Sequence, residues 1–160
     1  MRSSQSTASA PALIGKAKEL EIAGALVGAG LYVFFPLVDA GFDLVATNRK
    51  GTAYLTVQVK YRASNPALGL NPKECANFEG TNVVLAWIIG TGDEARQWFI
   101  PYNKWKERAI APKRRKDGLV YLQISENEGW LRRFQGARGI QRSFRSFSSD
   151  AWPRTCHGSF

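Results

Sequence analysis

The chain has few of the residues that characterise several common classes of protein. Its 160 residues include two cysteines, Cys75 and Cys156, and a single histidine, His157. The cysteines lie far apart and form no paired motif, so the sequence indicates neither a disulfide framework nor a structural zinc site, and we expect a reducing compartment. His157 has no ligand-like spacing to other residues, and Cys75 has no histidine nearby in sequence to activate it. These absences argue against metal–thiolate chemistry and against a cysteine nucleophile.

Long apolar runs are also absent. No segment approaches the ~20 apolar residues that a membrane-spanning helix requires. Residues 1–12 are rich in serine and alanine but lack the apolar segment of a signal peptide. We therefore expect no membrane association and a cytoplasmic location.

Acidic residues are outnumbered: 13 aspartates and glutamates stand against 22 lysines and arginines, giving a formal net charge of +9. Such an excess favours a polyanionic partner, most often nucleic acid, because lysine and arginine contacts to phosphates release counterions. Part of the excess lies near the C-terminus, where a solvated tail is the alternative explanation.

The composition is otherwise that of a globular protein, and the length suits one domain with tails. We predict a flexible lead at residues 1–12, a core at residues 13–125 and a basic C-terminal segment at residues 126–160. In the last segment arginines alternate with aromatic residues, a pattern that is typical of segments gripping nucleic acid by charge and stacking. Disorder is an equally open interpretation of that segment.

The pattern of apolar residues predicts a mixed succession of helices and strands. A helix is expected at residues 13–29, where Gly28 and Gly30 supply the stop. The continuous apolar run at 83–89 is typical of a central strand buried on both faces. Further strands are expected at 31–35, 42–46, 54–60, 97–100 and 119–124, a short helix at 102–106, and a long loop at 63–81.

Residues 42–62 read as a β-hairpin, because two apolar segments flank a polar, glycine-containing turn at 48–51. In the second segment apolar and polar residues alternate, so Gln58 and Lys60 share one face of the strand. With Asp43 on the partner strand, these side chains are able to form a site for a metal ion and a lysine. The alternative is a half-buried hairpin with one solvated face.

Glu19 is a second candidate. It lies three, four and seven residues before Ile22, Ala23 and Leu26, which places it on the apolar stripe of the predicted helix. A carboxylate that faces a core is costly unless it is paired or bound to a cation. The alternative is that Glu19 lies at the margin of the stripe and reaches water.

Together these features resemble the PD-(D/E)XK nuclease superfamily, over roughly residues 14–105. The chain is most similar to the small members related to group I intron homing endonucleases and Holliday-junction resolvases. Gln58 stands where the superfamily usually has an acid, which gives the QXK variant of the intron-endonuclease branch. The resemblance is carried by Lys18-Glu19 ahead of Gly30, by 33–36 followed by Asp39, by 41–45, and by 57–61.

The resemblance implies an α/β fold with a restriction-endonuclease-like core, in which helices flank a mixed central β-sheet. It also implies a Mg²⁺-dependent DNA endonuclease, with Mn²⁺ as a substitute, whose catalytic residues are Glu19, Asp43, Gln58 and Lys60. Asp43, Gln58, the Val59 backbone carbonyl and Glu19 would bind the metal, and Lys60 would position water or stabilise developing charge. Because Gln58 is a neutral ligand, the alternative is a catalytically weak or inactive nucleic-acid-binding domain. A third interpretation is an interaction module with a basic surface.

We expect DNA as the partner and a homodimer or higher homo-oligomer, in which two sites cut two strands. The residues predicted to contact DNA are basic and follow the hairpin or lie toward the C-terminus: Arg62, Lys113, Arg114, Arg115, Lys116, Arg132 and Arg133.

Overall fold

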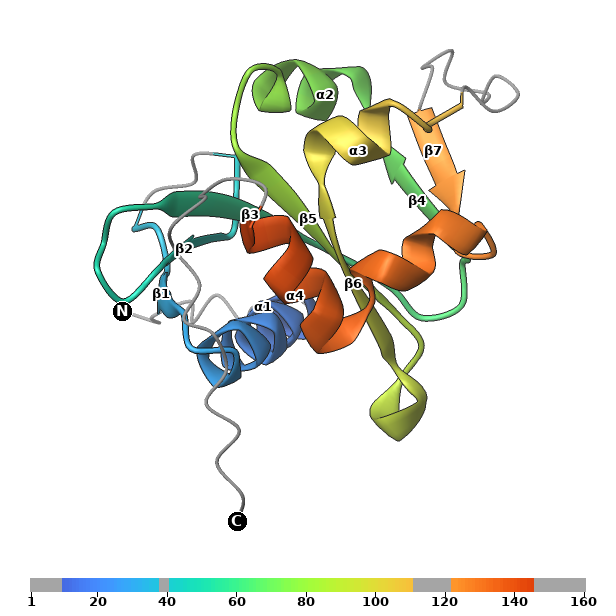
Figure 1. Cartoon of the computed structure of the whole chain (residues 1–160). Helices are drawn as coiled ribbons and strands as arrows, with labels where there is room; N and C mark the ends of the chain where they lie inside the picture. The colour runs from blue at the N-terminus through green and yellow to red at the C-terminus, as the bar shows by residue number, and fades with distance from the viewer. Residues whose placement is uncertain (1–9, 38–40, 111–121, 146–160) are drawn as a thin grey trace, which may run out of the picture.

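The structure is a computed structural model that describes residues 10–37, 41–110 and 122–145. Four strands follow the first helix, and helices and strands then intermix along the described chain, with two short 3₁₀ helices (Figure 1). In order they are α1 (Ala10–Gly28), β1 (Tyr32–Phe34), β2 (Leu44–Thr47), β3 (Tyr54–Arg62), β4 (Ala67–Leu70), α2 (Pro72–Phe78), β5 (Val83–Ile89), η1 (Gly92–Glu94), β6 (Arg96–Pro101), α3 (Tyr102–Lys106), β7 (Leu122–Ser125), η2 (Gly129–Phe134) and α4 (Gly136–Arg145).

Five strands form a central sheet in the order β1-β2-β3-β5-β6. The β2–β3 pair is the predicted hairpin, and its antiparallel register aligns Leu44 with Val57. β3 and β5 are parallel, whereas β1–β2 and β5–β6 are antiparallel. The sheet is therefore mixed, as the resemblance implied. β4 and β7 form a separate two-stranded sheet.

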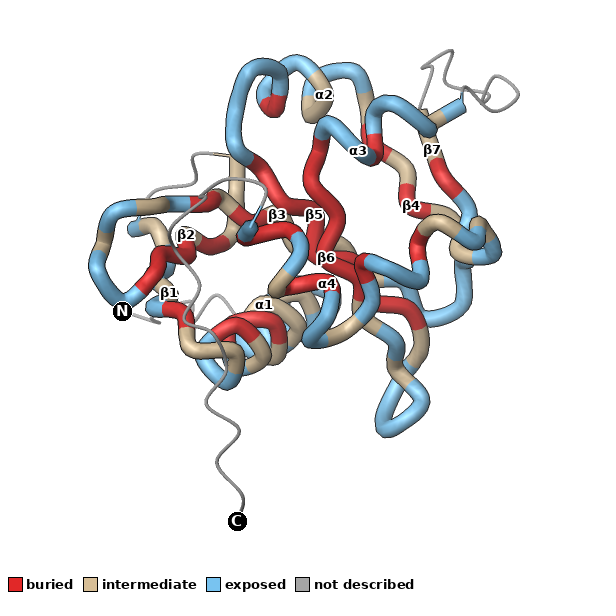
Figure 2. Tube along the Cα trace, viewed as in Figure 1, coloured by how far each residue is buried: buried red, intermediate tan, exposed pale blue. Residues whose placement is uncertain are grey.

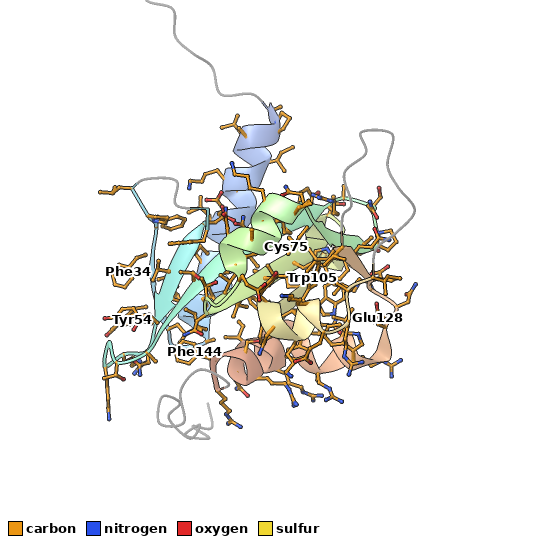
Figure 3. All side chains as sticks on the ribbon, turned by 90° about the horizontal axis from the view of Figure 1, so that it is seen from above. Phe34, Tyr54, Cys75, Trp105, Glu128 and Phe144 are labelled. Carbon is orange, nitrogen blue, oxygen red and sulfur yellow. The ribbon has the colours of Figure 1, made fainter. Side chains whose placement is uncertain are left out.

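The strand β5 has all seven residues buried, which confirms the prediction of a central strand covered on both faces (Figure 2). Val84, Ala86 and Ile88 face the helices α1 and α4, and the other β5 residues face α2, α3, η2 and the small sheet. Trp105 of α3 is fully buried, whereas Phe34 and Tyr54 are exposed at the opposite edge of the molecule (Figure 3). The core thus consists of two apolar layers separated by the sheet.

The helix α1 buries Ile22, Ala23 and Leu26 of the predicted apolar stripe, whereas Val27, which the sequence pattern places on the same stripe, is 57% exposed. It begins at Ala10, three residues before the predicted start, with Pro11 in its first turn, where the missing N–H of proline costs nothing. Among the described residues, no helix combines the length and the apolar character of a membrane span.

The prediction of a long loop at residues 63–81 is wrong, because β4 and α2 occupy most of it. Asn71 caps α2: its side chain accepts a hydrogen bond from the Glu74 N–H (2.9 Å), and the Glu74 carboxylate accepts one from the Asn71 N–H (2.9 Å). This reciprocal capping box starts a short helix that apolar periodicity alone does not reveal.

The C-terminal segment folds as far as it is described, up to Arg145. η2 and α4 wrap around the edge strand β6, and a bridge pairs Trp98 with Gln135. Phe134 packs in the layer under α3, and Phe144 packs in the layer under α1. Of the residues predicted from sequence, Asp39, Lys113, Arg114, Arg115, Lys116, Cys156 and His157 lie outside the described residues, as do residues 119–121 of the strand predicted at 119–124.

Candidate active site

Asp43 lies directly before β2, at the point where that strand leaves β3. Its backbone N–H donates to the Val57 carbonyl (2.9 Å), which continues the β2–β3 ladder by one residue. Its carboxylate oxygen Oδ2 accepts two hydrogen bonds, one from the Val59 N–H and one from Gln58 Nε2, each at 2.6 Å. The hairpin therefore fixes the carboxylate through both backbone and side-chain contacts.

Lys60 lies two residues after Gln58 on β3 and shares its face, as the alternation predicted. Its ammonium group donates to Oε1 of Glu74 on α2, and both side chains are largely buried. The other carboxylate oxygen of Glu74, Oε2, accepts the Asn71 N–H of the capping box. Glu74 thus ties the position of Lys60 to the N-terminus of α2.

Glu19, the remaining residue of the predicted catalytic set, lies on α1. It forms an ion pair with Lys16 one turn earlier (2.6 Å), and its side chain is 19% exposed, against 60% for Lys16. Glu19 thus lies at the margin of the buried stripe, which is the alternative stated from the sequence, and its negative charge acts on Asp43. Glu21 lies further round the helix, where it accepts from Gln97 Nε2 (2.6 Å) and pairs with Lys18 (2.7 Å).

The electrostatics of the site centre on Asp43. Burial raises the pKa of its carboxyl above the ordinary value, and the charge of Glu19 raises it further. The hydrogen bond from the Val59 N–H and the positive charges of Lys60 and Lys16 lower the pKa of Asp43, but by less than burial and Glu19 raise it. The pKa of the Cys75 thiol is raised, mainly by burial, which disfavours the thiolate and agrees with the sequence argument against a cysteine nucleophile.

The structure brings Asp43, Gln58 and Val59 into direct contact and sets Glu19 and Lys60 within electrostatic range of Asp43. The predicted DNA contacts are more scattered. Arg62 is exposed at the end of β3, where its guanidinium donates to the Tyr61 carbonyl (2.8 Å). Arg132 and Arg133 are exposed on η2, beside the edge strand β6.

The donor set suits a hard divalent cation. Within the described residues no group of three or more histidine, cysteine, aspartate or glutamate side chains could hold a metal. Mg²⁺, however, is commonly held by one or two carboxylates and keeps several waters, and all of its preferred ligands are oxygens. Asp43, Glu19, the Gln58 amide oxygen and a backbone carbonyl meet that description. Burial raises the pKa of Asp43, and a bound cation would favour its ionised form.

Sequence reasoning missed Glu74. The signal that could have found it is the run Asn71-Pro72-Lys73-Glu74, which has a capping residue, a proline at the first helical position and an acid three residues after the cap. That pattern predicts a helix N-terminus after β3. It does not predict that the capping glutamate also binds Lys60.

The fold, with this cluster at β2 and β3 inside a mixed sheet, is that of the resolvase and restriction-endonuclease-like class of nuclease folds. A solved structure of Hjc from Archaeoglobus fulgidus, a Holliday junction resolvase from an archaeal hyperthermophile, superposes with a TM-score of 0.52. The match covers 71% of this chain and 84% of that chain, at 20% sequence identity. No protein-family model matches the sequence, and no curated protein matches it. The similarity therefore concerns the fold.

Proposed function

We propose that the protein is a metal-dependent endonuclease of the PD-(D/E)XK type, in its QXK form, that hydrolyses DNA phosphodiester bonds. The observation that carries the proposal is the Asp43 carboxylate held by Val59 and Gln58 beside Lys60. The fold shared with a junction resolvase supports it, because that protein is a nuclease acting on DNA junctions. The net charge of +9 supports a polyanionic substrate.

In this proposal Asp43, Gln58, the Val59 carbonyl and Glu19 hold Mg²⁺, for which Mn²⁺ substitutes. When bound, the ion supplies charge neutralisation at the phosphate and a more acidic water molecule. Because Asp43 is fixed by two hydrogen bonds, its geometry is set before DNA arrives. Gln58 would offer its amide oxygen to the ion only after a turn of the amide, because Nε2 faces Asp43 in the structure.

Lys60 has the role of placing positive charge near the attacked phosphate. Its ammonium is anchored by Glu74, and a fixed donor stabilises developing negative charge at no cost of reorganisation. Lys60 also lowers the pKa of Asp43, so the lysine favours the ionised form that binds a cation. The two side chains therefore act together, Asp43 as an anionic ligand and Lys60 as an electrostatic stabiliser.

The second candidate is a catalytically weak or inactive DNA-binding domain on the same fold. The observation that favours it is the neutral Gln58, which leaves Asp43 and Glu19 as the carboxylates of the site. A neutral amide binds Mg²⁺ less strongly than a carboxylate does. The two candidates differ in metal-dependent turnover and agree in DNA binding.

The test is cleavage of supercoiled plasmid and of a four-way junction in Mg²⁺, Mn²⁺ or EDTA, by the native protein and by Asp43→Asn. We expect metal-dependent nicking that Asp43→Asn lowers by at least about 100-fold, with binding in EDTA nearly unchanged. Asp93→Asn is the matched control, because Asp93 is exposed on η1 and loses the same charge. Cleavage that survives Asp43→Asn would contradict the site, and absent cleavage with intact binding would favour the second candidate.

We further propose that the active form is a homodimer or a higher homo-oligomer, because two equivalent sites are needed to cut two strands symmetrically. Light scattering coupled to gel filtration, with and without junction DNA, measures the mass directly. A monomer under both conditions would contradict this part of the proposal without affecting the cleavage test.

A further inference from the structure

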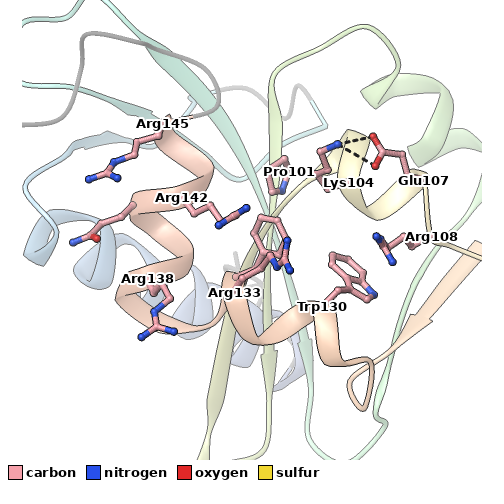
Figure 4. Close-up of a pocket in the computed structure, with 11 residues that line it drawn as sticks. Pro101, Lys104, Glu107, Arg108, Trp130, Arg133, Arg138, Arg142 and Arg145 are labelled. Atoms are coloured by element: carbon pink, nitrogen blue, oxygen red, sulfur yellow. Dashed lines mark hydrogen bonds and ion pairs between the residues drawn. The ribbon is translucent and has the colours of Figure 1, made fainter.

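A basic groove of about 690 Å³ lies between α3, η2 and α4, along the outer edge of the central sheet (Figure 4). Its lining is dominated by arginines: Lys104, Arg108, Arg133, Arg138, Arg142 and Arg145 stand against a single carboxylate, Glu107. That carboxylate already pairs with Lys104 at 2.8 Å and 3.0 Å. The five arginines therefore set the charge of the groove.

Among the described residues no carboxylate pairs with Arg133, Arg138, Arg142 or Arg145. Unpaired like charges that line one groove repel each other, so their clustering lowers stability unless an anion is bound. An anionic ligand would remove that repulsion, and the guanidinium fork matches phosphate oxygens.

Three of the arginines form a regular stripe. Arg138, Arg142 and Arg145 follow one another at intervals of four and three residues, so they project from one side of α4. The other side of α4 buries Ile140 and Phe144 against the sheet, which holds the stripe in place. At 1.5 Å per residue the stripe is ~10 Å long. One strand of duplex DNA places a phosphate every ~3.4 Å along the axis, so the stripe covers about three phosphates.

Aromatic rings hold two of the guanidinium groups. Arg142 lies over the Phe134 ring at 5.7 Å from the ring centre, and Arg108 lies over Trp130 at 5.2 Å. Stacking on a ring leaves the N–H groups at the rim of the guanidinium free to bind oxygens. The groove is thus a built surface with fixed donors, unlike a set of mobile surface lysines.

The groove is separate from the Asp43 cluster. Gln58 aligns with Leu85 and Leu85 aligns with Ile100, so β5 and β6 lie between the cluster and the groove. At ~4.8 Å per strand, Gln58 and Ile100 are ~10 Å apart within the sheet, and the groove opens beyond Ile100 at Pro101. The strands β5 and β6 therefore separate a ligand in the groove from Asp43.

We propose that this groove binds the sugar–phosphate backbone of DNA and is a second DNA-binding surface that takes no part in the chemistry. This proposal and the proposed function both take DNA as the partner, but binding of DNA at the groove does not require cleavage. Loss of the groove should therefore weaken DNA binding and leave the rate at saturating DNA unchanged.

The test compares two double variants that each remove two positive charges. Arg138→Gln/Arg145→Gln changes the groove, and Arg49→Gln/Lys50→Gln changes the exposed turn between β2 and β3. Fluorescence anisotropy with a labelled 20-base-pair duplex and a four-way junction is measured in EDTA over a range of salt concentrations. We expect the groove variant to bind on the order of 10-fold or more weakly, with a salt dependence reduced by about 2 in log–log slope. The turn variant should change affinity by less than about threefold.

Equal losses in the two variants would overturn the proposal, because net charge alone would then explain them. The affinity for polyaspartate is measured in the same way. If polyaspartate binds as tightly as DNA, and only when the groove arginines are intact, the groove binds an acidic polypeptide and the proposal is overturned. Cleavage in Mg²⁺ is measured in parallel. If the native protein binds DNA through the groove but does not cleave it, the nuclease proposal is refuted and the groove proposal stands. If the native protein cleaves DNA and the groove variant binds as tightly as the native protein, the groove proposal is refuted and the nuclease proposal stands.

Discussion

The ion pair between Lys60 and Glu74 gives a prediction with a worked magnitude. Its side chains are 17% and 26% exposed, so solvent screens the pair less than it screens a surface ion pair. Replacing Glu74 by glutamine removes the charge but keeps an oxygen that accepts the Asn71 N–H, since glutamine also serves in a capping box. A hydrogen bond between charged groups contributes about 1.5–3 kcal/mol, and the partial exposure of this pair lowers that to about 1–2 kcal/mol. For a chain of 160 residues that corresponds to a fall in Tm of about 2–8 °C.

The effect on catalysis should exceed the effect on stability. Without Glu74 the Lys60 ammonium is no longer held at one position, and misplacing a catalytic group by about 1 Å costs up to ~100-fold in rate. We therefore expect Glu74→Gln to lower single-turnover cleavage at saturating DNA and Mg²⁺ by about 10–100-fold. The control is Asn71→Ala, which removes the cap of the same helix at about 1 kcal/mol and leaves the Lys60–Glu74 pair in place. It should cleave within about threefold of the native protein.

Two results would refute this reasoning. Equal losses of activity in Glu74→Gln and Asn71→Ala would mean that α2 matters through its stability and that Glu74 does not position Lys60. Urea unfolding of Glu74→Gln, Lys60→Gln and the double variant gives the coupling energy between the two side chains. A coupling energy below about 0.3 kcal/mol would show that the two side chains do not stabilise each other.

Three further predictions concern the site and the C-terminal helices. Because the pKa of Asp43 is raised, its contribution to stability is full below the ordinary aspartate value near 4 and is lost as pH rises through the raised value. In EDTA, Asp43→Asn should accordingly melt at a higher temperature than the native protein at pH 8, with the gap closing toward pH 4 in a thermal-shift titration. Gln58→Glu supplies a third carboxylate, so calorimetry should show Mg²⁺ bound at least about 10-fold more tightly, and weaker binding would contradict Gln58 as a ligand. In Gly139→Ala the added carbon would lie 1.8 Å from the Phe134 carbonyl oxygen, so urea unfolding should show a loss of about 2–3 kcal/mol. Gly129→Ala meets nothing within 4 Å and should change stability by less than about 0.5 kcal/mol.

The sequence predicted those parts of the fold whose residues carry a strong local pattern. The run at 83–89 is apolar at every position, and alternation at 54–60 fixes which side chains share a face, so β5 and β3 could be placed in advance. The contacts of Asp43 with Gln58 and Val59 follow from the same hairpin, because its register is set by a buried face and a turn.

The rest could not be predicted because it depends on partners far away in sequence. α2 is seven residues long and buries Phe78, which gives too few turns for a periodic signal. Glu74 contacts Lys60 fourteen residues earlier, and only the crossover from β3 through α2 to the parallel strand β5 brings them together. α4 carries a regular arginine stripe, but the local pattern does not show that its apolar side packs against β6. In each case the fold, and not the local pattern, decides the contact.

The glutamine at position 58 has a consistent physical role beside Asp43. A carboxylate there would place a third negative charge beside Asp43, whose pKa is already raised by burial and by Glu19. The amide instead donates to Asp43 Oδ2 at 2.6 Å, so a neutral hydrogen-bond donor lies where a glutamate would repel the carboxylate. Because an amide carries both a donor and an acceptor, a half-turn of the same side chain exchanges Nε2 for Oε1 and converts that donor into an oxygen ligand. Gln58 therefore avoids the repulsion that a further acid would bring beside Asp43, and in the proposed nuclease it would lower the affinity for Mg²⁺ relative to a glutamate.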